Sequence, residues 1–573
     1  MIPRGRVDDA WSHSRSPPGE VVRLSWYAPP LLTYVLVSLF TSPEYMADTV
    51  GYANDIVKHT YDRSVPQVWD FGHLLWRPLG SLVCGGLQLL NSSSSVSDGD
   101  ARKTVLAVLV VLSWMSGFVC VLTLVAILTQ FFRERASITL TSLAFIFSQA
   151  FLNFSRAGTS YIPGLCFLLT GIFLLLRRND GQSSLAPLWA GCALAVSALL
   201  WLPYVLSIPA ALVSPLFILD NNRRWRCSLL AAAAFTIVSA SVYGLVMLHL
   251  RIVNTEGLAS WIAMSTWAAG VGGAKRAVFG LARSFINMGN DGLLFKRFLA
   301  QDPYNPVSVP QLFRLTLAKI VFFYAFMAGV VLCLARSRIG KNILGLLAIN
   351  AATVGIFAVL WYGGDMERYL PLYPVLFLGI CASMNVRGYE FWFRTLTIAF
   401  LAVIGLSNAI AMANFTINRD QQRVVERTRE LLPYLTPQSR VFVHDTDDQL
   451  YAFSRNSPFH PLNRSGNFQA NAILIPGTRR DLHWQQSFAV LALAVWDQHG
   501  TVWISKRVLS ARPLSEWNWV EGSDSRVRWK DTFFFFSDLD WGTSVGSTDG
   551  FVLLLPTQKN RGELTQFLAG ASV

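Results

Sequence analysis

Up to about residue 413 the chain alternates between long apolar runs and short polar connections. A membrane-spanning helix needs about 20 largely apolar residues to cross roughly 30 Å of hydrocarbon. The run 185–219 is divided in two, because Pro203 and Pro209 interrupt it and a single helix of that length would measure about 52 Å. By these criteria the sequence predicts eleven spans, at 24–42, 104–132, 137–153, 160–176, 185–202, 204–219, 228–250, 312–335, 342–361, 369–385 and 391–413.

The composition agrees with a chain whose main solvent is lipid. Apolar residues make up 52% and charged residues 14% of the 573 positions, whereas an ordinary globular domain has about 25% charged residues. This composition excludes a disordered protein and a coiled coil, and the 38 Phe and 19 Trp residues do not suit several water-covered domains. All seven cysteines precede residue 414, so the polar C-terminal part contains no disulfide framework.

The net charge is +13, and the basic residues are concentrated in alternate connections between the predicted spans. Cytoplasmic loops carry an excess of Lys and Arg, and the short connections on one side of the predicted bundle hold only Arg156 and Arg368. The connections on the other side are basic, with Arg4, Arg6, Arg15, Arg23, Arg133, Arg135, Arg177, Arg178, Arg223, Arg224, Arg226, Arg336, Arg338, Lys341, Arg387 and Arg394. We therefore expect a cytoplasmic N-terminus in a bacterial-type inner membrane. No motif for nucleic-acid binding accompanies the positive charge.

Three long segments are then expected on the outer side: 43–103, 251–311 and the tail from 414. The second predicts helices lying in the membrane interface, because its charges alternate with Trp261, Trp267, Phe279, Phe285, Leu293 and Phe298. The tail has an apolar helical run at 484–496 and short β-type runs at 440–444, 472–475, 501–505, 532–537 and 551–555. The sequence predicts an all-α polytopic membrane domain over 1–413 and an extracytoplasmic α/β domain over 414–573.

The first outer loop opens with acids at a spacing of seven, Asp48, Asp55 and Asp62. Seven steps of about 100° return to nearly the same face of a helix, and Tyr52 lies close to that stripe. The opposite side of the same helix is apolar, with Met46, Val50, Ala53, Ile56, Val57 and Thr60. The pattern predicts a surface helix with a polar face. Asp48 follows the first span closely, so we expect it at the membrane boundary, beside the polar head of a lipid-linked reactant.

Two further clusters place polar residues among aromatic ones on the outer side. His73 is suited to a base or a substrate contact, or to a structural hydrogen bond. Arg77 is suited to phosphate binding or to snorkelling at the interface. Arg368, at the start of the span 369–385, offers planar donors to phosphate oxygens. Glu367 would orient that guanidinium, or the two side chains would form an internal pair that caps a helix.

These clusters, in this topology, resemble the GT-C superfamily of integral-membrane glycosyltransferases, especially the protein O-mannosyltransferase and aminoarabinose-to-lipid-A transferase type. The family's acidic motif in the first outer loop is similar to Ala47-Asp48-Thr49-Val50-Gly51-Tyr52-Ala53, with Thr49 where a second acid often stands. Its later Gly-His and Pro pattern resembles Gly72-His73 and Pro78. Its Arg-Tyr with spaced prolines resembles Arg368-Tyr369, Pro371 and Pro374.

The resemblance implies transfer of a sugar, with inversion, from a polyprenyl-phosphate-linked donor to a lipid, glycan or protein acceptor. Asp48 would be the base that takes the acceptor's proton, and Arg368 would face the leaving phosphate. Glu367, Tyr52, His73, Arg77 and Asp55 would contact substrate. The sequence has no evident metal-ligand cluster, although Asp48 with another loop acid could hold a divalent cation weakly. The alternatives are a secondary transporter or lipid flippase and a non-catalytic membrane scaffold.

Overall fold

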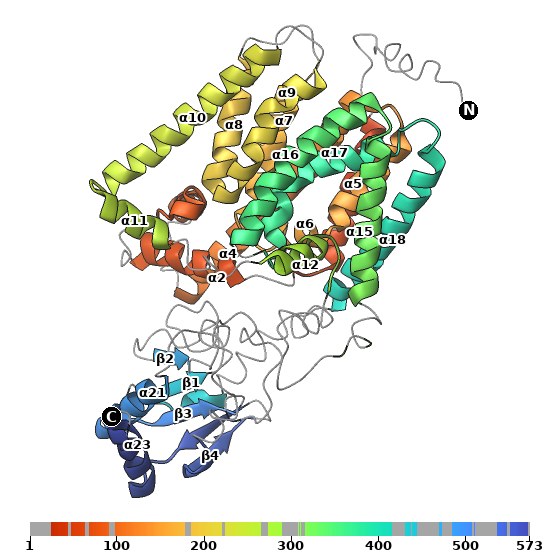
Figure 1. Ribbon diagram of the computed structural model, residues 1–573. Coiled ribbons are helices and arrows are strands. Elements are labelled where there is room, and N and C mark those ends of the chain that lie inside the picture. The colour runs from red at the N-terminus through yellow and green to blue at the C-terminus, as the bar shows by residue number, and fades with distance from the viewer. Residues whose placement is uncertain are drawn as a thin grey trace.

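The computed structural model has a large helical part and a small C-terminal part built around a sheet (Figure 1). The structure describes residues 24–43, 47–62, 68–90, 98–177, 185–219, 224–264, 273–288, 308, 310, 316–361, 363–414, 430–436, 438–443, 469–472, 484–506, 509, 536–546 and 550–570.

The helical part contains both long helices and short ones. The α-helices are α1 (Ala28–Phe40), α2 (Ala47–Val57), α3 (Trp76–Leu90), α4 (Asp98–Phe131), α5 (Arg135–Phe147), α6 (Gln149–Phe154), α7 (Tyr161–Leu176), α8 (Ala186–Leu200), α9 (Ile208–Ile218), α10 (Arg224–His249), α11 (Thr255–Met264), α12 (Ala274–Phe285), α15 (Thr316–Leu334), α16 (Arg338–Leu360), α17 (Tyr373–Ser383) and α18 (Glu390–Asn414). The remaining turns of helix are η1 (Leu24–Trp26), η2 (Lys58–Asp62), η3 (Phe71–His73), η4 (Leu202–Ser207), η5 (Met366–Leu372) and η6 (Leu432–Tyr434).

The protein is an integral membrane protein. Within the described residues, five helices are long and apolar enough to cross a bilayer, namely Thr104–Phe131, Arg224–His249, Leu317–Leu334, Arg338–Leu360 and Glu390–Ala413. The other six predicted spans coincide with shorter apolar helices, α1, α5, α7, α8, α9 and α17. The longest of these has 16 residues and measures about 24 Å at 1.5 Å per residue. The structure therefore confirms five spans, and the count of eleven stays a prediction.

Two of the expected helix boundaries are informative. The run 185–219 is divided as predicted, because α8 ends at Leu200 and η4 and α9 each begin next to a proline. The predicted span 137–153 is not one helix, since Ser148 adopts an extended conformation between α5 and α6. The Ser148 hydroxyl donates to the Phe145 carbonyl at 2.7 Å. This local hydrogen bond offers the backbone an alternative to the helix, and the short helix α6 follows directly.

The segment η5 is held from several sides. The Tyr369 hydroxyl donates to the carbonyls of Ala277 at 2.6 Å and Gly363 at 2.8 Å, which ties η5 to α12. The Pro371 carbonyl accepts hydrogen bonds from Ser207 and Asn350, which ties it to η4 and α16. Buried polar groups paired in this way fix the position of a short, irregular segment.

The aromatic residues of the second outer segment pack into protein. Trp261, Phe279 and Phe285 are almost completely buried, with exposed fractions of 4%, 3% and 0%. These three side chains therefore pack into the protein, and the interfacial position of the helices that carry them stays a prediction. The rest of that expectation falls on Trp267, Leu293 and Phe298, which lie outside the described residues.

The backbones of α12 and of the turn before η5 pack closely at Gly280. Adding one methyl group there should strongly lower the stability of the protein. A Cβ atom at Gly280 would lie 2.0 Å from the Gly363 carbonyl oxygen, so one backbone must move. We expect Gly280→Ala to destabilise the protein by about 1–3 kcal/mol, as overpacking usually does, measured by thermal unfolding in detergent. Gly244→Ala is the matched control, because a Cβ there meets no atom within 4 Å. Equal melting temperatures for both variants would contradict the expected clash.

The C-terminal part confirms a small α/β arrangement. Its strands are β1 (Arg440–Val443), β2 (Gln469–Ala472), β3 (Val502–Ser505), β4 (Trp541–Val545) and β5 (Phe551–Leu554). They form one mixed sheet in the order β2-β1-β3-β5-β4, in which β1 is parallel to β2 and β3, and β5 is antiparallel to β3 and β4. The helices α21 (Trp484–Asp497) and α23 (Gln558–Gly570) contribute Phe488, Ala492 and Leu564 to its core.

The predicted runs of this part match the structure unevenly. The runs at 440–444, 484–496, 501–505 and 551–555 are confirmed as β1, α21, β3 and β5. The run at 472–475 overlaps β2 only at Ala472, and the run at 532–537 is wrong where it is described, because Phe536 and Ser537 are helical. The strand β4 and the helix α23 were not predicted, since neither has the apolar pattern of a buried element. The boundary at 413/414 stays a prediction, because 415–429 lie outside the described residues.

Candidate functional site

The helix α2 begins shortly after α1 ends and presents Asp48 in its first turn. The Asp48 side chain is exposed, and its carboxylate accepts a hydrogen bond from the Tyr161 hydroxyl. Tyr161 is the first residue of α7 and is itself only 5% exposed. A buried phenol therefore orients a carboxylate whose remaining surface is open.

The turn before α7 is pressed against α2. The Thr49 hydroxyl donates to the Ala157 carbonyl, and Gly158 adopts a φ of +78° beside it. A Cβ at Gly158 would lie 2.6 Å from Cγ2 of Thr49. Position 158 therefore requires glycine, both for its left-handed backbone and for its small size. The contact between this turn and α2 places Tyr161 opposite Asp48.

His73 contacts both α2 and the start of α7. Its Nδ1 is 2.8 Å from Oγ of Ser160, and the Tyr52 hydroxyl lies 3.3 Å from its Nε2 and 3.4 Å from its Nδ1. Burial lowers the pKa of His73 to about 4, so the ring is neutral at pH 7. These contacts favour the structural interpretation of His73, as the link between η3 and the start of α7.

Tyr52 does not lie on the solvated polar face that the sequence predicted. It is 4% exposed and packs between His73 and Arg77, whose guanidinium carbon lies 4.8 Å from the ring centroid. Ala53, Ile56 and Val57 are also buried. These three residues belong to the predicted apolar face, and α2 packs against α3 and α4. The structure therefore differs from the prediction at Tyr52, which is buried.

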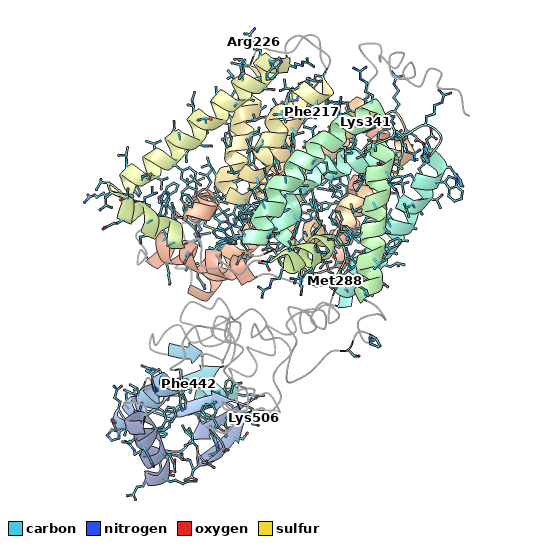
Figure 2. The ribbon with its side chains drawn as sticks, viewed as in Figure 1. Phe217, Arg226, Met288, Lys341, Phe442 and Lys506 are labelled. Carbon is cyan, nitrogen blue, oxygen red and sulfur yellow. The ribbon has the colours of Figure 1, made fainter. Side chains whose placement is uncertain are left out.

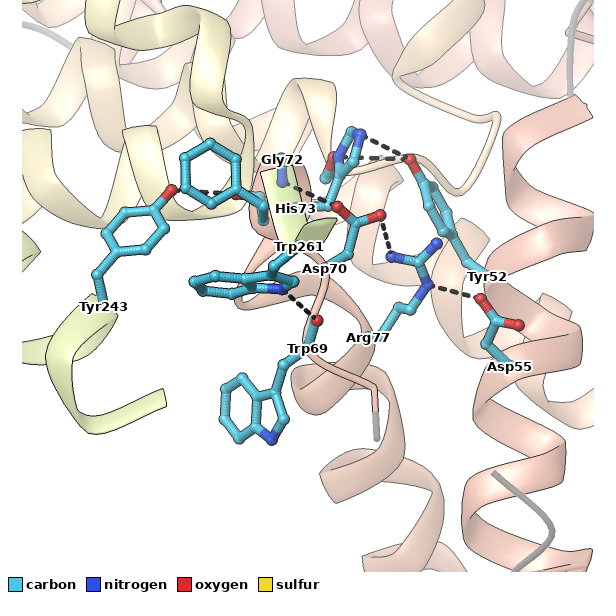
Figure 3. A network of polar contacts seen from close by, with 11 residues as sticks. Tyr52, Asp55, Trp69, Asp70, Gly72, His73, Arg77, Tyr243 and Trp261 are labelled. Atoms are coloured by element: carbon cyan, nitrogen blue, oxygen red, sulfur yellow. Dashed lines mark hydrogen bonds and ion pairs between the residues drawn. The ribbon is translucent and has the colours of Figure 1, made fainter. Parts of the chain in front are cut away.

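Arg77 lies between two carboxylates (Figure 3). Its Nε donates to Asp55 at 2.8 Å and its Nη1 to Asp70 at 2.7 Å. Burial opposes its charge, but Asp70, Tyr52 and Asp55 outweigh this effect and raise the pKa of Arg77. The guanidinium therefore stays charged, and Asp55 and Asp70 balance its charge. The sequence had suggested phosphate binding or snorkelling for Arg77, and neither interpretation included these acids.

Aromatic side chains support the chain around Asp70. The Trp261 indole donates to the Trp69 carbonyl at 3.1 Å, and the Tyr243 hydroxyl donates to the Phe71 carbonyl at 3.0 Å (Figure 3). Asp70 itself accepts from the Gly72 amide at 2.8 Å and caps η3. The segment 69–73 is thereby tied to α10 and α11, so His73 and Asp70 hold fixed positions.

Glu367 and Arg368 lie on η5. The Arg368 Nε is 4.0 Å from Oε1 of Glu367, and among the described residues it is a buried donor without a hydrogen-bond partner. Burial opposes the charge of Arg368, but Glu367, Asp365, Tyr161 and Asp48 outweigh it and raise its pKa. A charged, partly desolvated guanidinium with an unused donor is suited to binding an anion.

Asp48 interacts electrostatically with η5, because its charge helps to raise the pKa of both Glu367 and Arg368. The structure thus brings Asp48 on α2, Tyr161 on α7 and the Glu367–Arg368 pair into one electrostatic neighbourhood. Sequence reasoning missed Tyr161, Ser160 and Asp70. Tyr161 was counted as part of a span, and no signal marks one tyrosine at a helix start as a partner for a distant carboxylate.

Arg156, the other basic residue in the short connections of the predicted outer side, has a structural role. Arg156 is 5% exposed, and its Nη1 donates to the Thr41 hydroxyl at 2.5 Å and to the Thr41 carbonyl. Thr41 ends α1. Arg156 therefore satisfies groups at the carboxyl end of a helix, where a cation is favoured, and it holds the start of the loop that carries Asp48.

The described residues offer no ligand set for a metal ion. No three His, Cys, Asp or Glu side chains among them are grouped closely enough to hold one. Asp48 is oriented by a phenol, and Asp55 and Asp70 are engaged with Arg77. The acids that the structure describes therefore do not fit a cation site.

The pKa of Glu367 leads to a prediction about pH. Burial first, then the charges of Asp365 and Asp48, raise it from 4.5 to about 8 even with Arg368 adjacent. Between these two values the folded state holds one more proton than the unfolded state, so stability should fall as pH rises across this window. We expect the melting temperature to decrease from pH 5 to pH 8, and Glu367→Gln to flatten this dependence. A slope unchanged in the variant would contradict the assignment.

The chain is similar over most of its length to solved GT-C glycosyltransferases. The oligosaccharyltransferase of Archaeoglobus fulgidus, in complex with Zn and sulfate, matches with 13% identity and a TM-score of 0.47, over 84% of this chain and 68% of that one. ArnT from Cupriavidus metallidurans, bound to undecaprenyl phosphate, matches with 11% identity and a TM-score of 0.48, over 93% and 98%. The arabinofuranosyltransferase AftD from Mycobacteria matches with 12% identity and a TM-score of 0.41, over 85% and 37%.

No protein-family model and no curated protein matches the sequence. At these identities and TM-scores, the similarity describes an overall arrangement of helices and assigns no role to any residue.

Proposed function

We propose that this protein is a membrane glycosyltransferase that moves a sugar from a polyprenyl-phosphate donor to a hydroxyl group of a lipid, glycan or protein. The observation that carries the proposal is an exposed carboxylate, Asp48, in the same electrostatic neighbourhood as a buried guanidinium donor of Arg368 without a partner among the described residues. Sugar transfer from a phosphate needs both groups, one to take a proton and one to receive an anion.

In the proposed step the acceptor hydroxyl gives its proton to the Asp48 carboxylate, and its oxygen bonds to the anomeric carbon. The bond between that carbon and the phosphate oxygen breaks, with inversion, and the polyprenyl phosphate leaves with the electron pair. The charge that develops on the phosphate would face Arg368, where a fixed donor is most effective. Tyr161 would hold Asp48 in place. Glu367, Tyr52, His73, Arg77 and Asp55 remain the proposed surroundings of the substrate.

We further propose that residues 1–413 form the membrane domain with eleven spans, and that the segments 43–103, 251–311 and 414–573 lie on the extracytoplasmic side of a bacterial inner membrane. One feature supports this orientation: the basic side chains Arg226 and Lys341 lie at one end of the helical part, and Met288 lies at the other (Figure 2). Residues of the cytoplasmic end should be rich in Lys and Arg.

The test uses membranes that contain the protein and a polyprenyl-phosphate sugar with a radiolabelled glycosyl group. Transfer of label to an endogenous lipid, glycan or protein, together with loss of a glycolipid from cells without the protein, supports the proposal. Absence of transfer from every sugar tried, with unchanged envelope glycans, overturns it. Protein-dependent movement of a solute across the same membranes would favour the transporter instead.

A further inference from the structure

A second feature suited to a ligand is an open groove at the opposite end of the helical part. It lies between α15 and α18 and has a volume of about 410 Å³, within the range of about 300–1,000 Å³ typical of small-molecule sites. Its lining combines apolar and aromatic side chains with a single charged residue and consists of Gly329, Leu332, Cys333, Arg336, Tyr389, Trp392, Phe393 and Leu396.

The groove is far from the Asp48 site. Its residue Arg336 precedes the first residue of α16 by two positions, whereas η5 with Arg368 follows the other end of that helix. The helix α16 has 23 residues and measures about 34 Å at 1.5 Å per residue. The groove is therefore a separate site, and its occupant does not depend on the function proposed for Asp48.

The guanidinium of Arg336 is held at the groove. Its Nη1 donates to the Tyr389 hydroxyl at 2.8 Å, and its guanidinium carbon lies 5.4 Å from the Tyr389 ring centroid. A guanidinium has five N–H donors in a planar fork, so this one bond fixes its direction and leaves donors for an anion. Trp392 is 73% exposed at the same place, as is common for aromatic residues at the level of lipid headgroups.

The surroundings of Arg336 are positively charged. Arg338, Lys341 and Arg387 are exposed on the segments that flank the groove. Glu390, an acid at the start of α18, accepts a hydrogen bond from the Gly388 amide. The apolar lining of the groove and the basic residues around Arg336 suit a ligand with a hydrocarbon chain attached to a phosphate group.

We propose that this groove binds an anionic glycerophospholipid of the bilayer, with an acyl chain between α15 and α18 and the phosphate at Arg336. Since each basic residue near an anionic lipid surface favours such lipids about fivefold, loss of Arg336 should remove about a fivefold preference.

The experiment measures how strongly lipids with brominated acyl chains quench Trp392, in nanodiscs that contain the full chain. The Trp392 signal is the emission of the protein minus that of Trp392→Phe. Brominated phosphatidylglycerol should quench this signal at a mole fraction at least about fivefold lower than that of brominated phosphatidylcholine. Arg336→Gln should lower this preference about fivefold. Gly329→Leu, which fills the groove, should reduce quenching by both lipids.

Arg226→Gln is the matched control, because it removes the same charge from the same end of the molecule but from α10. It should leave the preference intact. Equal quenching by the two lipids would overturn the proposal, because the groove would then have no preference for an anionic lipid. An equal loss in Arg226→Gln and Arg336→Gln would overturn it in favour of a general basic surface. Displacement of phosphatidylglycerol by a tenfold lower amount of polyprenyl phosphate would also overturn it, since the groove would then belong to the lipid carrier.

Discussion

Replacing Asp48 by Asn is expected to lower the rate of sugar transfer about 10²–10⁴-fold, the usual contribution of a positioned general base. Asn has nearly the same shape as Asp, and its amide oxygen can still accept the hydrogen bond from Tyr161. The substitution therefore keeps the local packing and removes only the ability to take a proton. The measurement is initial rate of transfer from a labelled polyprenyl-phosphate sugar, at saturating donor, in membranes with equal amounts of each protein.

Asp497→Asn is the control for this substitution. Asp497 forms a surface ion pair with Arg561 at 2.7 Å in the C-terminal part, so the same chemical change there should leave transfer unaltered. Thermal unfolding of both purified variants shows whether they fold. Normal turnover by a folded Asp48→Asn protein would remove Asp48 from the mechanism.

Replacing Arg368 by Gln is expected to lower the rate constant for transfer about 10²–10³-fold, as loss of one fixed donor to a developing anion does in other enzymes. The effect should appear mainly in kcat, because the phosphate gains charge only as the sugar leaves. Arg368→Lys should recover part of the loss, since an ammonium supplies the charge but lacks the planar fork. The measurement is kcat and KM for the donor in each variant.

Arg561→Gln is a matched control on the C-terminal part, where Arg561 pairs with Asp497 and lies 5.6 Å from the Trp496 ring centroid. It should change neither constant. An increase of KM alone in Arg368→Gln, with kcat unchanged, would show that Arg368 binds the donor without stabilising the leaving phosphate. Unchanged kcat and KM in a folded protein would exclude Arg368 from the site.

The sequence identified a large part of the candidate site. Asp48, Tyr52 and His73 were selected from one loop, and Glu367 and Arg368 from a connection about three hundred residues later. They could be selected because charges are rare in this chain and because Arg368 departs from the orientation pattern. The same reasoning could not distinguish Arg368 from Arg156, which also departs from it but caps α1.

The spacing of the acids predicted one polar stripe, and the structure separates its members. Asp48 meets Tyr161, whereas Asp55 meets Arg77 together with Asp70. The side chain of Asp62 lies outside the described residues. A helical period fixes which residues share a face, but the partners on that face come from other helices, and their approach depends on packing.

The sequence by itself determined that this is a helical membrane protein with a small polar α/β part, because hydrophobic length and charge distribution follow directly from the cost of placing polar groups in lipid. It also determined which rare polar residues deserved a functional interpretation. Only the tertiary structure decided that η5 is held by α12, that Tyr161 orients Asp48, and that Arg77 is balanced by two acids. The reason is physical: these contacts join residues far apart in the chain, and no local pattern encodes which helices will meet.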